Sequence, residues 1–354
     1  EMAMYADDPD SVAYQLLMQT LYLKHPRRWP VLGEPAAFDC LTRQDVLDYH
    51  ASRYVPNNVV LSIAGDVDAA EILSHLELLV EDLKSRPLNR EPIPHEPHQF
   101  GSRRVRKEFA VPYSKLHLAW RLPCSAHPDT PALSALSSIL GGGRSARFYE
   151  KFHDRLGLVY SIEVHSNQSE TDEGAFTISM DVDRAQRDKV RDLVLQELRN
   201  LAEEDFTEDL KRVCKQTRVS RLRRRSSASG VASEMGADWF GSRNLNLSSE
   251  WQEAIERVTT EDLHRVCSTW LSSPNVTEVS LDPPGSNAGD EERASASAGT
   301  ALSEHVLGNG MKVVIREDHR LPLAYACMAF KAGCRAENEH DAGVTDLMSE
   351  CLLK

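Results

Sequence analysis

Apolar residues recur at helical spacing in two stretches of the chain. In the first stretch they lie at Ala13, Leu16, Leu17 and Leu21. The second stretch has the cleaner pattern, with apolar residues at Val190, Leu193, Val194, Leu198 and Leu201. Because residues three and four apart share one face of an α-helix, each stretch is predicted to form an amphipathic helix that buries one side.

A period of two marks the candidate strands. Between residues 116 and 122, Leu116, Leu118, Trp120 and Leu122 alternate with other side chains, which is typical of a half-buried β-strand. Residues 59–64 and 175–182 are further strand candidates. Helices and strands mix without strict βαβ alternation, so we predict an α+β fold with a mostly antiparallel sheet flanked by helices.

Two distant segments share one pattern at a constant offset. The matching positions are Thr42 and Thr259, Asp45 and Asp262, Asn58 and Asn275, and Val59 and Val276. A threonine before a helix can accept hydrogen bonds from the free N–H groups of the first turn, and an acid there suits the helix dipole. The ungapped match indicates a duplicated module, and therefore a repeated, two-lobed organisation.

Two linkers separate the periodic segments. Residues 87–103 hold four prolines among many charges, and the stretch from Pro283 to 300 is rich in Gly, Ser, Ala and acids. The second stretch has no apolar face to bury, so we expect a flexible, exposed connector there.

Size and charge narrow the possible classes of protein. A chain of 354 residues exceeds one ordinary core and favours two or more domains. The net charge of -13 argues against a nucleic-acid footprint over the whole chain. No run of about eighteen apolar residues occurs, so no membrane span is predicted. The seven cysteines are irregularly spaced and predict neither a zinc knuckle nor a disulfide framework.

Basic residues gather in one predicted helix, residues 211–225. Most such helix faces lie in solvent, and a functional alternative is that this face lines a chamber and attracts acidic peptides. The helix lacks the interleaved aromatic residues of single-strand binders, which makes a nucleic-acid role the weaker interpretation.

No complete metal site can be assembled from the sequence. Catalytic zinc needs three protein ligands, and two histidines on successive turns of a helix commonly supply two of them. The thirteen histidines include neither His-x-x-Glu-His nor His-Glu-x-x-His. The closest approach is His95-Glu96-Pro97-His98, where Pro97 disfavours a helix and a solvated linker is expected.

Three glycines, Gly141, Gly142 and Gly143, precede a further predicted helix. They lack the Gly-Lys-Ser/Thr of a phosphate loop, so close backbone approach and unusual dihedral angles are the better interpretation.

Several motifs together resemble the M16 family of zinc peptidases (pitrilysin and insulinase-like). They are the 141–149 run with 156–161, the 307–315 segment followed by Gly333, Arg335 and Glu337, and the 343–354 terminus. In active modules of the family, the helix that matches the 343–354 segment carries His-x-x-Glu-His. Here the matching positions are Asp346, Ser349 and Glu350. The resemblance therefore implies a degenerate third module without catalytic zinc.

The resemblance also assigns roles to individual residues. Glu1, followed by Asp7-Asp8-Pro9-Asp10, matches the glutamate that serves as the third zinc ligand in the family. Tyr160 matches a tyrosine that helps bind substrate or stabilise the oxyanion. Its usual arginine partner is replaced by His153, which is shorter and lacks the guanidinium fork, so a structural role is expected for this pair.

The resemblance implies an internal fragment of a multi-module protein. The expected parts are the C-terminal part of a first M16 module at 1–86, a linker at 87–103, a second module at 104–284, a flexible linker at 285–300 and a degenerate third module at 301–354. The isolated chain is expected to be inactive. The missing N-terminal and C-terminal modules would be its partners in the parent protein.

The parent is expected to be a metalloendopeptidase that binds zinc and cleaves peptides or small unfolded proteins inside a two-lobed chamber. In that mechanism a zinc-bound water attacks the peptide carbonyl with a glutamate as general base. The alternative is a non-catalytic scaffold or partner subunit with the same fold.

Overall fold

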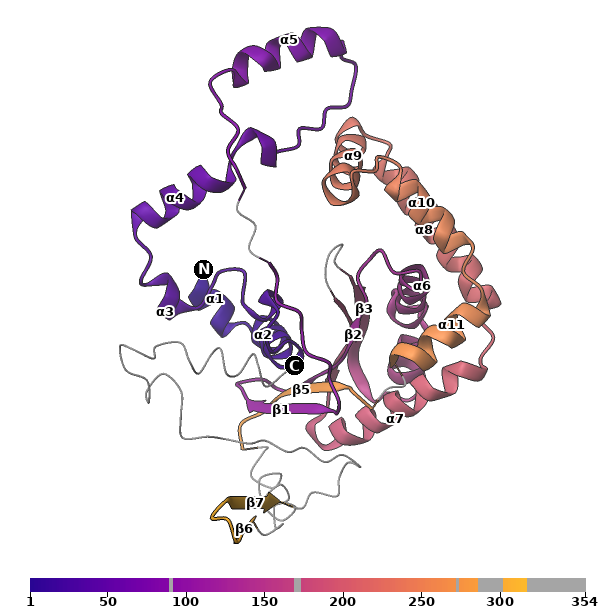
Figure 1. Ribbon diagram of the computed structural model, residues 1–354. Coiled ribbons are helices and arrows are strands. Elements are labelled where there is room, and N and C mark those ends of the chain that lie inside the picture. Colours follow the sequence, from indigo (N-terminus) through magenta and orange to yellow (C-terminus); the bar gives the residue numbers. More distant parts are fainter. Residues whose placement is uncertain (89–91, 169–172, 272–273, 286–301, 317–354) are drawn as a thin grey trace, which may run out of the picture. The chain divides into compact units, whose positions relative to one another are not determined.

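The computed structural model describes residues 1–88, 92–168, 173–271, 274–285 and 302–316. It divides into two compact units, 1–294 and 295–354. The α-helices of the first unit are α1 (Met2–Asp7), α2 (Pro9–Leu21), α3 (Pro35–Phe38), α4 (Arg43–Arg53), α5 (Ala69–Val80), α6 (Thr130–Gly141), α7 (Arg187–Asn200), α8 (Thr207–Arg224), α9 (Ala228–Ser242), α10 (Leu247–Glu256) and α11 (Thr260–Val266) (Figure 1). Its strands are β1 (Arg103–Glu108), β2 (Ser114–Leu122), β3 (Val159–Asn167), β4 (Gly174–Val182) and β5 (Thr277–Asp282).

These strands form one five-stranded sheet in the order β1-β5-β2-β4-β3. β1 runs parallel to β5, and the pairs β2–β5, β2–β4 and β3–β4 are antiparallel. The prediction of an α+β fold with a mostly antiparallel sheet is therefore confirmed, and residues 175–182 lie in a strand as predicted.

Helices cover one face of the sheet and enclose the larger core. Leu116, Leu118, Trp120 and Leu122 of β2 point to this face with Phe176, Ile178 and Met180 of β4. Buried residues of α6, α7, α8 and α11 complete the cluster. The predicted face of α7 is confirmed, since Val190, Val194 and Leu198 are buried there.

The opposite face of the sheet is covered by α2. Leu17, Met18 and Leu21 form a second core cluster with Ala119 of β2 and Val279 of β5. The predicted burial of one α2 face is thus confirmed. The prediction of a half-buried strand at 116–122 is wrong, because a helix about a hundred residues away covers the side that local alternation assigns to solvent.

The two matched Thr-x-x-Asp segments both cap helices. Thr42 is the N-cap of α4, and its hydroxyl accepts from the backbone N–H of Asp45, while the Asp45 carboxylate accepts from the Thr42 N–H at 2.8 Å. Thr259 and Asp262 form the same reciprocal capping box at α11. The predicted caps are confirmed in both copies.

Residues 59–64 are extended but belong to no strand. Val59, Leu61 and Ile63 are exposed, and the residues between them are half-buried. The Ser62 hydroxyl donates to the Ala232 carbonyl of α9 at 2.7 Å. The strand prediction for this segment is wrong because side-chain alternation alone does not make a strand, which also needs a backbone partner to form its ladder.

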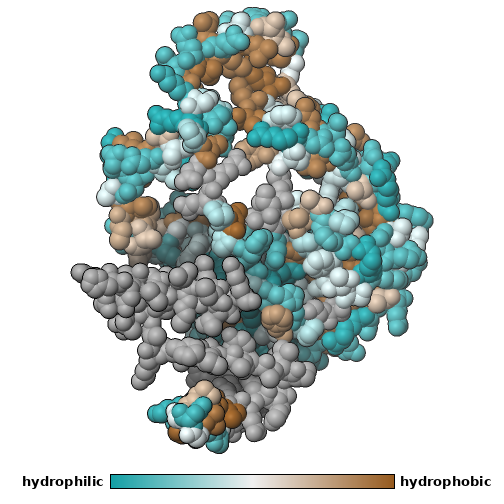
Figure 2. Space-filling model, viewed as in Figure 1, coloured by the Kyte–Doolittle hydropathy of each residue, from teal (hydrophilic) through white to brown (hydrophobic). Residues whose placement is uncertain are grey.

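Apolar side chains remain exposed on the same part of the chain. Figure 2 shows them gathered over α5, where Leu78 and Leu79 are 69% and 78% exposed. Val46 and Tyr49 of α4 are also exposed. An apolar patch of this kind is typical of a contact surface.

Arginines and acids fill the space between β5 and α7. Asp282 and Arg187 are both fully buried and form an ion pair. The same carboxylate accepts from the Ser114 hydroxyl at 2.6 Å and from the Ser280 hydroxyl at 2.9 Å. Four residues earlier on β5, the carboxylate of Glu278 lies 2.9 Å from Arg104 Nε.

The second unit contributes one described hairpin, β6 (Leu302–Val306) with β7 (Lys312–Arg316). Gly310 has φ 84° in its turn, a conformation that glycine adopts without strain. The Gly333, Arg335, Glu337, Asp346, Ser349 and Glu350 positions lie outside the described residues, as does most of the predicted 285–300 linker. In the described part of the chain, no helix has both the length and the apolar character needed to cross a membrane.

Replacing Asp282 with Asn is expected to destabilise the protein strongly. Asn keeps the size of the side chain but removes the buried carboxylate opposite Arg187, which keeps only the partly exposed Asp188 as an acidic partner. Breaking a buried ion pair costs about 3–5 kcal/mol in similar cases. Urea unfolding followed by circular dichroism measures the change. The control is Glu253→Gln, whose pair with Arg257 is 61% and 74% exposed and is worth at most about 1 kcal/mol. Equal losses in the two variants would contradict the assignment.

Candidate functional site

Tyr160 lies on β3 with its side chain 61% exposed. Its ring is 5.3 Å from that of Tyr113, and the Lys115 ammonium lies 5.7 Å from the Tyr113 ring. Lys115 Nζ in turn donates to Asp10 Oδ1 of α2 at 2.6 Å and to Asp181 Oδ1 of β4 at 3.1 Å. We call these five residues the Tyr160 cluster.

The Tyr160 cluster holds α2 against the sheet. Burial lowers the pKa of Lys115, but the hydrogen bonds to Asp10 and Asp181 more than offset this and raise the pKa above its usual value. The ammonium therefore stays charged and is already matched by two carboxylates. Sequence reasoning found only Tyr160 in this group, because the other members are brought to it by cross-strand pairing and by the docking of α2.

His117 follows Lys115 on the same face of β2. Its Nδ1 lies 2.9 Å from the Ser179 hydroxyl, directly across the ladder on β4. Burial lowers the pKa of His117 to about 4, and the nearby Lys115 charge adds to the effect. At neutral pH this imidazole is uncharged and shares a hydrogen bond with a hydroxyl.

His153 lies on a different element from Tyr160. It belongs to the π-helical turn Tyr149–Arg155, where its ring stacks on Tyr149 at 4.4 Å between centroids. Its Nδ1 is 2.7 Å from Asp154 Oδ1. The side-chain partners of His153 are thus Tyr149 and Asp154, and the structural role expected for His153 stays a prediction supported by this local packing.

The glycine run brings the end of α6 against β3. A Cβ on Gly141 would lie 2.4 Å from the Val164 backbone nitrogen, far inside van der Waals contact. Gly143 has φ 102°, a conformation that other residues rarely adopt. The interpretation of these glycines as a close-packing element, in place of a phosphate loop, is confirmed.

Glu1 is exposed at the start of α1 and caps the helix with its backbone only. The described residues contain no group of three or more His, Cys, Asp or Glu side chains that could hold a metal ion. Since catalytic zinc needs three protein ligands, this part of the chain does not fit a zinc ion by itself. The assignment of Glu1 as a ligand stays a prediction.

The 95–98 segment is better ordered than a solvated linker. Glu96 is 9% exposed, and its carboxylate accepts from the backbone N–H groups of Leu23, Lys24 and His25 at 2.7, 2.8 and 2.9 Å. Burial raises the pKa of Glu96, but these three hydrogen bonds lower it below its usual value. The expectation of a solvated segment is thus wrong at Glu96, where the turn after α2 supplies buried donors, while His95 and His98 are exposed.

Most cations of the basic helix α8 are matched by acids. Arg218 pairs with Glu256 at 2.8 Å, and Arg221 and Arg225 share the buried Glu234 of α9. Arg212 and Lys211 pair with acids one turn earlier in α8. On its other side the helix buries Leu210 and Val213 in the core.

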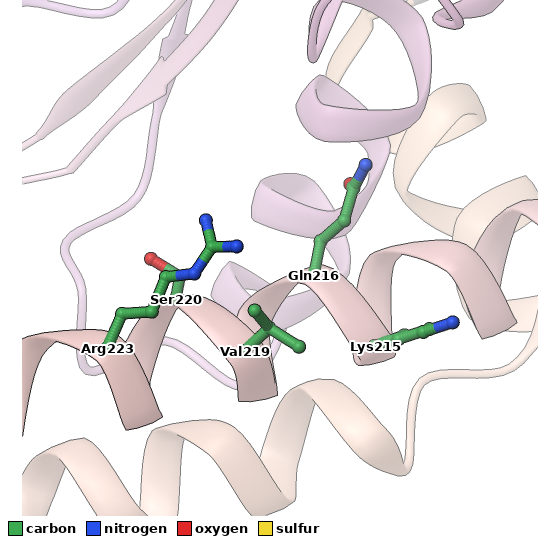
Figure 3. A pocket seen from close by; sticks show the side chains of 5 residues that line it. All are labelled: Lys215, Gln216, Val219, Ser220 and Arg223. Atoms are coloured by element: carbon green, nitrogen blue, oxygen red, sulfur yellow. The ribbon is translucent and has the colours of Figure 1, made fainter. Parts of the chain in front are cut away.

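The remaining face of α8 lines a hollow of about 310 Å³. Figure 3 shows its lining residues on one side of the helix, and they are Lys215, Gln216, Val219, Ser220 and Arg223. All five are exposed. Neither Lys215 nor Arg223 has a side-chain partner among the described residues, so this face offers two unmatched positive charges.

Comparison with known proteins finds similarity to one family of peptidases. Residues 41–216 match the peptidase M16 inactive domain. The zinc protease PqqE of Helicobacter pylori is 24% identical over 285 residues, which cover 78% of this chain and 63% of that protein. The chain thus spans less than two thirds of the length of this relative.

Solved structures share the fold. The peptidase M16 inactive domain from Pseudomonas fluorescens aligns with a TM-score of 0.71 at 20% identity, covering 79% of this chain and 67% of that one. A chain of complex III2 from Candida albicans aligns with a TM-score of 0.65 at 16% identity, covering 79% and 68%. These TM-scores show a common fold.

Acid is expected to destabilise the protein through His117. Its folded pKa of about 4 lies below the usual 6.5, so between these values the unfolded chain binds a proton that the folded chain excludes. Stability is therefore fully present above pH 6.5 and falls by about 3 kcal/mol as the pH approaches 4. Urea unfolding across this range should show a flatter profile for His117→Gln than for the wild type.

The matched control for this experiment is His95→Gln, because His95 is exposed in the described structure. Its pH profile should follow the wild type. A wild-type slope retained in His117→Gln would show that other groups carry the acid sensitivity.

Proposed function

Because the chain belongs to the M16 peptidase family, we propose that it is part of a zinc-dependent metalloendopeptidase that cleaves peptides inside a two-lobed chamber. The observation that carries the proposal is the match of residues 41–216 to the peptidase M16 inactive domain. The chain supplies chamber wall and support in this proposal, and the hydrolytic centre is completed by residues outside it.

Glu1 is the residue through which the chain would reach that centre. It precedes α1 with a free, exposed carboxylate, and the Tyr160 cluster fixes the following helix α2 to the sheet. In the longer protein Glu1 would be the third zinc ligand, and the two histidines would come from an upstream helix. Zinc would supply a polarised water as the attacking group.

The exposed apolar surface of α4 and α5 fits the same proposal. We propose that it contacts the remainder of the first module in the longer protein. A surface that carries Leu78 and Leu79 largely exposed is stabilised when a partner covers it.

A non-catalytic scaffold or partner subunit is the second candidate. Two observations favour it: the matched domain is of the inactive type, and one structural neighbour is a chain of complex III2. In this alternative the fold provides packing surfaces, and Glu1 has no metal to bind.

The purified 354-residue chain is expected to hold no stoichiometric zinc and to cleave no quenched fluorescent peptide, since its sequence lacks the histidine ligands and the base. Metal analysis and a fluorescence assay measure both properties. Tightly bound zinc accompanied by peptide cleavage in this chain would contradict the proposal.

Extending the chain by its upstream sequence separates the two candidates. The extended protein should cleave peptides, and Glu1→Gln should reduce kcat/KM by more than about 100-fold, because even outer-shell changes at metal sites cost 10–100-fold. The matched control is Asp7→Asn, which removes a neighbouring exposed carboxylate and should leave activity unchanged. An extended protein without zinc and activity would support the scaffold, and equal activity in Glu1→Gln would remove Glu1 from the site.

A further inference from the structure

The hollow on α8 has a defined arrangement of charge and apolar surface. Lys215, Val219 and Arg223 follow one another at intervals of four residues, so they form a stripe along the helix. Val219 is 37% exposed between the two cations. Gln216 and Ser220 lie beside the stripe and offer an amide and a hydroxyl (Figure 3).

The two cations of the stripe differ from the arginines of this segment that are paired with acids. Arg218, Arg221 and Arg225 are held by the acids of α9 and α10, which fixes these side chains away from new partners. Lys215 and Arg223 have no such partner among the described residues. An incoming carboxylate therefore displaces no existing ion pair, and Arg223 can bind it in a bidentate way.

The spacing of the stripe matches an extended peptide. Eight residues separate Lys215 from Arg223, which corresponds to about 12 Å along the helix axis. In an extended peptide, side chains two residues apart share one face, and four residues span about 13 Å. Two acids at positions i and i+4, with an apolar residue at i+2, thus place three side chains opposite Lys215, Val219 and Arg223.

We propose that this face of α8 binds extended peptide segments with an acid–x–apolar–x–acid pattern. The carboxylates contact Lys215 and Arg223, the apolar side chain covers Val219, and the peptide backbone lies within reach of Gln216 and Ser220. The inference rests on the proposed function and deepens it, because it names a class of peptide that the chamber wall would retain.

The test measures binding by the 354-residue chain itself and needs no catalysis. The probe is a fluorescein-labelled nine-residue peptide. Its central five residues are, in order, glutamate, threonine, isoleucine, threonine and glutamate. Fluorescence anisotropy should show binding that weakens as salt rises from about 0.05 to about 0.5 M, because ions screen exposed charges. Replacing both peptide glutamates by glutamine should weaken binding at least tenfold.

Variants of the chain assign the binding to the stripe. The double variant Lys215→Glu/Arg223→Glu should weaken binding at least tenfold, and Val219→Ser by a smaller factor of roughly three to ten, which reflects one lost apolar contact. The matched control is Lys211→Glu/Arg257→Glu, which makes the same change in net charge at two exposed, paired cations. Circular dichroism confirms that each variant is folded, and the control should bind like the wild type.

Three results would overturn the inference. The first is equal binding of the glutamine peptide, and the second is an equal loss in the control variant, which would indicate non-specific attraction. The third is competition by a single-stranded oligonucleotide whose binding is unchanged in Val219→Ser. That result would show that the face binds polyanions in general. Each leaves the experiments on Glu1 and zinc untouched, so failure here is distinct from failure of the proposed function.

Discussion

The buried carboxylate of Asp282 joins the parts of the sheet that the sequence separates most widely. β5 enters the sheet from the end of the first unit and lies between β1 and β2, which occur far earlier. At its last residue, Asp282 meets Ser114 at the start of β2 and Arg187 at the start of α7. Because these side chains are fully buried, they are stable only as a complete set, so the network favours a single register of β5.

This constraint also determines where α2 packs on the sheet. With β5 fixed, its other face presents Val279 to α2, and α2 is held further along by the ion pair from Lys115 to Asp10. The carboxylate of Glu96 then binds the turn that follows α2. α2 therefore contacts the rest of the module at several points, and the sheet determines its position.

The sequence predicted well what depends on neighbours along the chain. The helix faces at 13–21 and 190–201 and both capping boxes involve residues within one or two turns, and the structure confirms them. The second buried face of β2, the buried Glu96 and the missing ladder at 59–64 depend on segments distant in sequence. The same division applies to the candidate site, where Tyr160 was found by resemblance, while Tyr113, Lys115 and Asp10 reach it only through the fold.

The net charge of the chain does not by itself predict which ligands its surface binds, because ion pairs determine which charged side chains remain free to bind. The chain carries -13, which by itself disfavours acidic ligands. At physiological salt, however, exposed charges are screened beyond about 8 Å, so a ligand at the surface responds mainly to its immediate surroundings. On α8 those surroundings are Lys215 and Arg223, whose positive charges no described acid matches, whereas Arg221 and Arg225 are already matched by Glu234. An acidic chain can therefore present a face that attracts acids, and ion pairing determines which of its cations do so.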